Sequence, residues 1–361
     1  MPDLLPFLND LLSAPGLSGH EEPVARIIEE RWKPLVHEIS RSNIGSLHGL
    51  RRGTGPAPRP SVMISTHMDA IGLMVTGIVD GFLRVTSVGG VDARVLPGQP
   101  VTVHATGGGQ TALLPAVVAQ PSARLLPPEQ ADGPVPLEFL LIDTGLSPRQ
   151  VAQQVRVGDL VSYGTEPVEL AGEVITGHTL DNRASVAALT VCLEELQNRP
   201  HQWDVWAVAS SQEEVGLGGA LTSAFGLRPT LAIVVDVTFA KGPGANDWYT
   251  VAFGKGPTLC LGPNLHPALV KNLKELAEQL EIPYSMEYAP RHTGTDAYAI
   301  QVAAEGIPTA LISIPLRYMH TPVEMVSIKD IRRAGRWMAE FIARLTPDFM
   351  EKIVWEDKKN K

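Results

Sequence analysis

The chain has 361 residues, of which 44% are hydrophobic and 19% are charged, so it can bury a large core and form two domains. Its formal net charge of -9, without any basic stripe, argues against nucleic acid and anionic membranes as partners. The two cysteines, Cys192 and Cys260, are too few for a disulfide framework and predict a protein of the reducing cytoplasm.

The first part of the chain predicts a helix and a buried strand, followed by a segment with a different pattern of apolar residues. We expect no signal peptide and no membrane span, because no basic region precedes the first apolar residues and no run of eighteen apolar residues occurs. Helical spacing of apolar residues runs from Glu21 to Lys33, and SVMIST (61–66) predicts a buried strand. Short Val- and Thr-rich runs separated by Gly and Pro then predict a small all-β domain over residues 70–164.

The remaining chain alternates between strand and helix patterns, which is typical of an α/β domain. A helix that is apolar nearly all round is expected at 184–196, and a second at 267–280. Strands are expected at 203–209, 231–236 and 309–314. We therefore predict a mixed, mostly parallel sheet flanked by helices, formed by residues 1–69 and 165–361, with residues 70–164 inserted as a second domain.

Metal-ligand residue types follow the predicted strands. Ligands of open α/β sheets bind at the carboxyl ends of the strands, so side chains that follow different strands meet at one edge. The residues in question are His67 and Asp69, Glu213 and Glu214 in SSQEEVGLGGA, Asp236, and His320. Asp69 is close enough in sequence to His67 to accept its imidazole N–H and fix the tautomer.

Two groups of acidic residues could have roles other than metal binding or catalysis. Glu213 and Glu214 could be a solvated pair of surface carboxylates. Asp181, in GHTLDNR, could be either a metal ligand or an N-cap of the buried helix that follows it.

The candidate ligands also indicate which metals would bind. Two imidazoles and three carboxylates, from His67, His320, Asp181, Glu214 and Asp236, suit Zn²⁺ or Co²⁺, with Mn²⁺ as a third candidate. Two divalent ions would be balanced by three carboxylates and one hydroxide, and such a pair activates water for amide hydrolysis.

Several stretches together resemble the M42 family of di-metal aminopeptidases, which includes glutamyl and tetrahedral-shell aminopeptidases. The resemblance is carried by PGLSGHE (15–21), THMDAIGLMV (66–75), GGVDARVLPGQ (89–99), GHTLDNRASVAAL (177–189), SSQEEVGLGGA (210–220), VVDVT (234–238), TGTDAYAIQ (293–301) and MHTPVEMV (319–326). It implies a zinc-peptidase-like catalytic domain in which His67, Asp181 and Asp236 hold one ion, Asp181 bridges, and Glu214 and His320 complete the second.

The resemblance also implies the remaining roles and partners. Glu213 would be the general base, and Asp69 would orient His67. Substrates would be peptides with a free N-terminus, and the chain would form homo-oligomers, either dimers built through the inserted domain or twelve-subunit tetrahedral shells. The family has GGTDA where this chain has TGTDA (293–297), so substrate contacts of this loop stay open, as does helix capping by Thr295 or Asp296. Preference for an acidic, basic or apolar first residue is also open.

Other functions give different expectations. Related carboxypeptidases and deacylases carry their extra domain nearer the last ligand, whereas only 84 residues separate Asp236 from His320, enough for one helix and two strands. An endoglucanase would need two carboxylates and no metal. A catalytically dead binding module would have a damaged set of site residues, and all seven are present. An aminopeptidase is therefore favoured.

Overall fold

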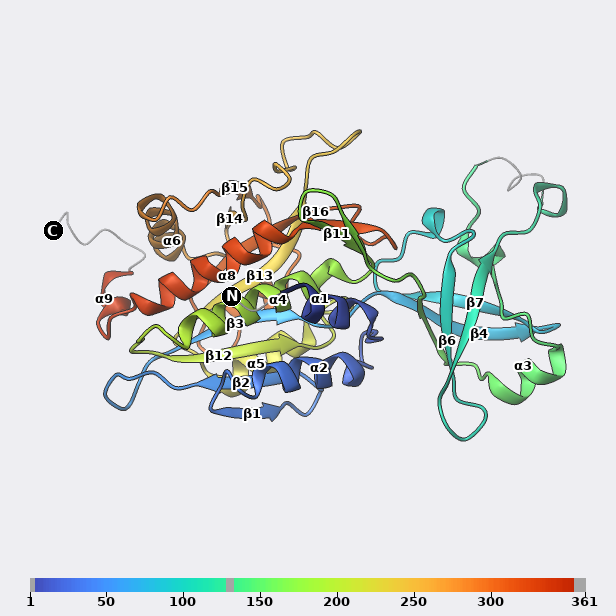
Figure 1. Ribbon diagram of the computed structural model, residues 1–361, viewed down its shortest axis with the longest axis horizontal. Coiled ribbons are helices and arrows are strands. Elements are labelled where there is room, and N and C mark those ends of the chain that lie inside the picture. Colours follow the sequence, from blue (N-terminus) through green and yellow to red (C-terminus); the bar gives the residue numbers. More distant parts are fainter. Residues whose placement is uncertain (1–3, 128–132, 354–361) are drawn as a thin grey trace.

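The structure is a computed structural model that describes residues 4–127 and 133–353. Within these residues the strands form one large sheet and one closed barrel, which lie next to each other along the long axis of the molecule (Figure 1). No helix in the described part of the chain has the length and apolar character needed to cross a membrane.

The large sheet is mixed and has eleven strands. They are β1 (Glu38–Arg41), β2 (Leu47–Arg51), β3 (Ser61–His67), β10 (Val168–Leu170), β11 (Val174–Gly177), β12 (Asp204–Ser210), β13 (Leu231–Phe239), β14 (Thr258–Leu261), β15 (Ser285–Tyr288), β16 (Thr309–Arg317) and β17 (Glu324–Ser327). Their order is β1-β2-β12-β3-β13-β16-β17-β11-β10, and β14 joins β15 to β16. The four central strands, β12, β3, β13 and β16, run parallel, while the outer neighbours are antiparallel.

Helices cover the central strands, which are buried along most of their length. The helices of this part are α1 (Leu4–Ser13), α2 (Glu22–Trp32), α4 (Leu180–Leu196), α5 (Gly218–Leu227), α6 (Pro267–Gln279), α7 (Asp296–Gln301), α8 (Ile328–Ala343) and α9 (Phe349–Lys352). Helix α4 packs on β3 and β13 and is itself covered by α8 (Figure 1). Gly335 permits this packing, because a Cβ there would lie 2.5 Å from the carbonyl oxygen of Ala188 on α4.

The barrel has its own apolar core, separate from that of the large sheet. Its strands, in the order β4-β5-β8-β7-β6-β9, are β4 (Gly72–Val79), β5 (Phe82–Val88), β8 (Leu141–Asp143), β7 (Ala112–Ala119), β6 (Pro100–Ala105) and β9 (Leu160–Tyr163). The described residues of this segment also contain three 3₁₀ turns: η1 (Ala93–Val95), η2 (Ala123–Leu125) and η4 (Leu137–Phe139). The segment is not all β, since it also contains α3 (Pro148–Gln154), which a capping box of Ser147 and Gln150 begins.

Three local expectations were inaccurate. Helix α4 begins at Leu180 instead of 184, although Asp181 and Asn182 depart from helical φ/ψ and make its first turn irregular. Strand β13 continues three residues past Asp236, because Val237 and Thr238 are also buried. Three strands and two helices lie between Asp236 and His320 instead of two strands and one helix, because β14 and β15 have only four residues each and α7 has six.

Candidate metal centre

The predicted site residues come together at one edge of the large sheet. The parallel register pairs His67, the last residue of β3, with Ser210, the last residue of β12. Glu213 and Glu214 follow β12 in the next turn, so they lie beside His67. Asp236 comes from β13, His320 follows β16, and Asp69 and Asp181 lie after β3 and at the start of α4.

The carboxylate of Asp181 lies between two imidazoles. Its Oδ1 is 3.1 Å from Nε2 of His67, and its Oδ2 is 3.3 Å from Nε2 of His320. Both oxygens therefore face histidines from two different parts of the chain. This geometry favours a metal ligand over a helix cap, which would turn the carboxylate towards backbone N–H groups of α4.

Two groups of potential metal ligands share Asp181. Ligand atoms of His67, Asp181 and Asp236 all lie within 4.8 Å of one another, and so do those of Asp181, Glu214 and His320. These are the two sets that the family resemblance implies. Glu213 is also close, since its carboxylate forms a similar group with His67 and Glu214.

Asp69 ties the imidazole of His67 to the loop that carries the two glutamates. It is fully buried, and its Oδ1 is 3.4 Å from Nδ1 of His67, whose Nε2 faces Asp181. Its carboxylate also accepts hydrogen bonds from the backbone N–H of Glu213 (3.0 Å) and of Glu214 (3.2 Å) and from the Ser18 hydroxyl (2.6 Å). The backbone carbonyl oxygen of Asp69 also lies 3.2 Å from Nδ1 of His67, so this one residue fixes both the ring and the glutamates.

Glu213 and Glu214 are not a solvated surface pair. Their side chains are 9% and 7% exposed. Burial, followed by repulsion from Asp236 and other carboxylates, raises the pKa of Glu213 to about 10, although His67 opposes this shift. Burial and the carboxylate of Asp181 raise the pKa of Glu214 to about 7.

The remaining electrostatics fit a site for cations. Burial, with repulsion from Asp181, raises the pKa of Asp236 well above its usual range. Hydrogen bonding to Asp181 is the main reason that the pKa of His320 rises to about 9. Buried carboxylates at such spacing are costly unless positive charge compensates them. Imidazole and carboxylate donors are suitable ligands for divalent transition metals, so the residues present fit such ions.

Sequence reasoning missed two buried carboxylates next to the site. Glu324, at the start of β17, accepts hydrogen bonds from the backbone N–H of Asp181 (3.0 Å) and of His320 (2.8 Å). Asp296 accepts hydrogen bonds from the hydroxyls of Ser65 (2.9 Å) and Ser210 (2.6 Å). A signal for Glu324 was available, because it is an acidic residue four positions after His320 in an otherwise apolar stretch.

The loop at 293–297 has one capping residue. The hydroxyl of Thr295 accepts a hydrogen bond from the backbone N–H of Ala297 and caps α7. Asp296, in contrast, turns towards the serines of β3 and β12. Of the two capping candidates in this loop, Thr295 is therefore the one that caps α7.

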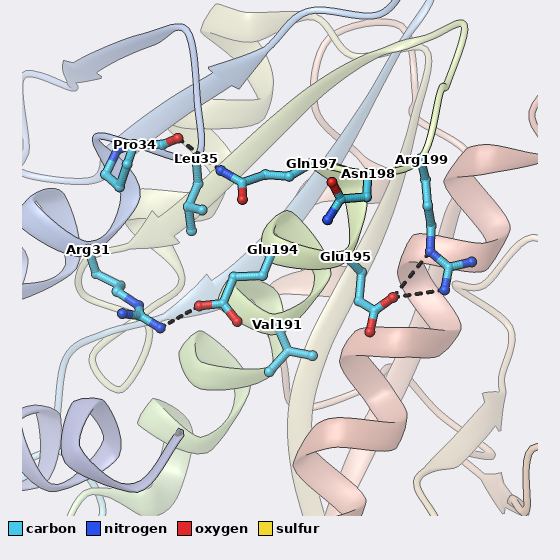
Figure 2. Close-up of a pocket in the computed structure, with 9 residues that line it drawn as sticks. All are labelled: Arg31, Pro34, Leu35, Val191, Glu194, Glu195, Gln197, Asn198 and Arg199. Carbon is cyan, nitrogen blue, oxygen red and sulfur yellow. Dashed lines mark hydrogen bonds and ion pairs between the residues drawn. The ribbon is translucent and has the colours of Figure 1, made fainter. Parts of the chain in front are cut away.

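A cavity of about 290 Å³ opens onto the site. Beyond the metal-ligand candidates and Glu213, its walls are formed by Val237, Thr238, Phe239, Glu287, Gly294, Thr295 and Met319. A larger hollow, of about 800 Å³, lies beside α2 and α4. Its charged residues pair among themselves, Arg31 with Glu194 and Arg199 with Glu195, so it offers no unpaired charge to a ligand (Figure 2).

Comparisons with known proteins identify the family of this chain. The family model described as M42 glutamyl aminopeptidase matches residues 45–336. The chain belongs to the M42 family. An M42 relative, the lysyl aminopeptidase of Pyrococcus furiosus, is 33% identical over 348 residues, which cover 94% of this chain and 97% of the relative.

Some solved structures with the same fold are aminopeptidases by name, and two others have endoglucanase in their descriptions. An aminopeptidase from the archaeon Desulfurococcus kamchatkensis has a TM-score of 0.89 and 35% identity, with 99% of each chain covered. The TET1 peptidase of Pyrococcus horikoshii, described as able to assemble into a tetrahedron or a large octahedral shell, has a TM-score of 0.81. It is 27% identical, with 95% of this chain and 100% of that chain covered. The M42 fold is thus shared over nearly the whole chain.

Proposed function

We propose that this chain is a metal-dependent aminopeptidase that removes N-terminal residues from peptides by hydrolysis. The observation that carries the proposal is the carboxylate of Asp181, which lies between His67 and His320 and belongs to two groups of potential ligands. Membership of the M42 family and the aminopeptidase names of the relatives support the same activity. The family model and these relatives do not favour the carboxypeptidase, deacylase or endoglucanase alternatives.

Two divalent ions are the proposed cofactor. His67, Asp181 and Asp236 would hold one ion, and Asp181, Glu214 and His320 would hold the other. The mixture of imidazole and carboxylate favours Zn²⁺ or Co²⁺, with Mn²⁺ as the third candidate. Such ions would lower the pKa of a water from about 15.7 towards about 7 and polarise the peptide carbonyl.

The protein's own residues would move the proton and hold the geometry. The carboxylate of Glu213 takes a proton from the attacking water and delivers it to the leaving amine nitrogen as the C–N bond breaks. Asp69 keeps Glu213 in place through the backbone N–H of that residue and keeps the ring of His67 oriented. Burial in the cavity excludes bulk water, which strengthens these electrostatic interactions.

Amide substrates with free and blocked N-termini test this function. A leucyl peptide should be cleaved from its N-terminus, whereas the same peptide with an acetylated N-terminus should resist, because the proposed site needs the free amine. Incubation with a chelator should abolish cleavage, and added Zn²⁺ or Co²⁺ should restore it. Efficient cleavage of the acetylated peptide would instead support a deacylase or endopeptidase, and full activity after complete metal removal would contradict metal-dependent catalysis.

We also propose that the chain works as a homo-oligomer assembled through the barrel. Residues 1–69 and 165–361 would form the catalytic domain and residues 70–164 the inserted one. Large apolar side chains on the barrel segment, Leu113 (61% exposed) and Leu125 (80% exposed), are candidates for burial between copies. A dimer is the smallest assembly, and the dodecamer described for PhTET1 suggests a twelve-subunit shell. Replacing residues 70–164 with a short linker should leave a monomer by light scattering, and an unchanged oligomer would contradict this interface.

Cellular location and substrate choice complete the proposal. A cytoplasmic location is supported by Cys192 and Cys260, which are both free and buried. The family description names glutamyl substrates and the Pyrococcus furiosus relative is named for lysyl ones, so these names do not agree on the first residue.

A further inference from the structure

Glu287 is a carboxylate in the cavity that belongs to none of the three groups of potential metal ligands described above. Glu287 lies on β15, at the wall of the cavity that contains the site, and is half-buried. The Thr238 hydroxyl donates a hydrogen bond to its Oε1 (2.9 Å), and the Thr258 hydroxyl donates one to its Oε2 (2.7 Å). The two threonines come from β13 and β14, so three strands fix the orientation of this carboxylate.

The charge of Glu287 has no cationic partner in the described part of the chain. No Lys, Arg or His nitrogen there lies within 4.0 Å of its oxygens, and its hydrogen-bond donors are neutral hydroxyls. Among residues 4–127 and 133–353, no Lys or Arg lines the cavity. Two divalent ions would be balanced by Asp181, Glu214, Asp236 and a hydroxide, so they would leave the charge of Glu287 uncompensated. The cavity therefore repels an anionic group and attracts a cationic one.

The position of Glu287 relative to the metal centre suits a long side chain. Thr238 follows Asp236 by two residues on β13, so both side chains leave the same face of the strand, about 6.6 Å apart along it. Thr238 contacts Glu287 directly. A lysine side chain carries its charge on a four-carbon stem. Phe239 and Met319 line the same cavity and offer apolar surface to such a stem.

We propose that Glu287 determines specificity by binding the cationic end of a basic first residue, so that the preferred substrates begin with Lys or Arg. The proposal rests on the aminopeptidase function proposed above. It assigns the carboxylate to the ammonium or guanidinium of the side chain. A carboxylate could also bind the α-ammonium group that every peptide carries at its N-terminus. Comparing substrates with charged and uncharged side chains distinguishes these two cationic groups.

Matched fluorogenic amides of lysine, arginine, norleucine and glutamate test the proposal, since norleucine is close to lysine without its charge. The intact enzyme should have a kcat/KM for lysyl and arginyl substrates about 10- to 100-fold above that for norleucyl, as expected of a hydrogen bond to a charged group. Glu287→Gln should remove this preference and leave norleucyl hydrolysis within about twofold. Glu169→Gln, a change at an exposed glutamate on β10, should change neither.

Three outcomes would overturn the assignment. Equal kcat/KM for lysyl and norleucyl substrates in the intact enzyme excludes a cation site for the side chain, whether or not the variant folds. An equal fall for all substrates in Glu287→Gln, with unchanged metal content, assigns the carboxylate to the α-ammonium. An unchanged lysyl preference in the variant shows that another group sets it. Failure of the intact enzyme to hydrolyse any of these amides would contradict the proposed function itself, which is a separate result.

Discussion

Glu324 supports both proposed metal groups without belonging to either. It is 2% exposed, and its two carboxylate oxygens accept the backbone N–H of Asp181 and of His320. Replacing it with Gln leaves one neutral oxygen acceptor and turns an NH₂ group towards the second backbone N–H. Hydrogen bonds to charged groups contribute about 1.5–3 kcal/mol each. We therefore expect the substitution to lose about that much of the free energy that holds Asp181 and His320 in position.

This loss should appear first in metal binding. Groups that orient metal ligands typically contribute 10- to 100-fold in affinity, so Glu324→Gln should weaken metal binding by that factor. Competition with a chromophoric chelator measures the affinity, and kcat measured at saturating metal should recover most of the intact value. Glu169→Gln, at an exposed position, serves as the control. Metal affinity unchanged in Glu324→Gln would refute the idea that this carboxylate holds Asp181 and His320 in position.

Three further predictions concern stability and the geometry of the glutamate loop. Burial lowers the pKa of His48 from 6.5 to about 4, so the folded state resists protonation, and stability present above pH 6.5 should fall by about 3 kcal/mol between pH 6.5 and 4. Urea unfolding at pH 7.5 and 5 should show about 2 kcal/mol of this loss in the intact protein, because pH 5 lies about 1.5 units below 6.5, and much less in His48→Asn; equal losses would contradict it. Gly219→Ala would place a Cβ 2.1 Å from the Ser211 carbonyl oxygen, so it should cost about 1–3 kcal/mol and lower metal content, whereas Gly226→Ala on the same helix meets open space and should do neither. Metal removal should lower the Tm by several degrees, since bound ions at 100 times their Kd stabilise by about 2.7 kcal/mol, and a Tm indifferent to the chelator would count against bound metal.

Much of the fold was predictable because its signals are local. Runs such as LAIVV and TALISI are continuous and apolar, as central parallel strands require. The strands of the barrel were visible as a change from these runs to short Val- and Thr-rich runs with Gly and Pro at turns. Element boundaries were less accurate, because the extension of β13 past Asp236 depends on burial by neighbouring elements, which no local pattern records.

The candidate site was predictable only in part. His67, Asp236 and the two glutamates could be identified because strand ends place them at one edge. The position of Asp181 between two imidazoles could not be derived from spacing, and it was expected only from the resemblance to the M42 family. Glu287 was missed because its relation to the site depends on the pairing of β15 with β14 and on two threonines far away in sequence.

The central claim is that Glu214 holds metal while its neighbour Glu213 moves the proton. Metal content by atomic emission, measured together with kcat for the intact enzyme, Glu213→Gln and Glu214→Gln, tests it most directly. We expect two ions per chain in the intact enzyme and in Glu213→Gln, which should nevertheless lose about 10²- to 10⁴-fold in kcat. Glu214→Gln should lose part of its metal and regain activity at high Zn²⁺ or Co²⁺. Equal metal loss in both variants, or a fully active Glu213→Gln enzyme, would contradict this assignment of roles.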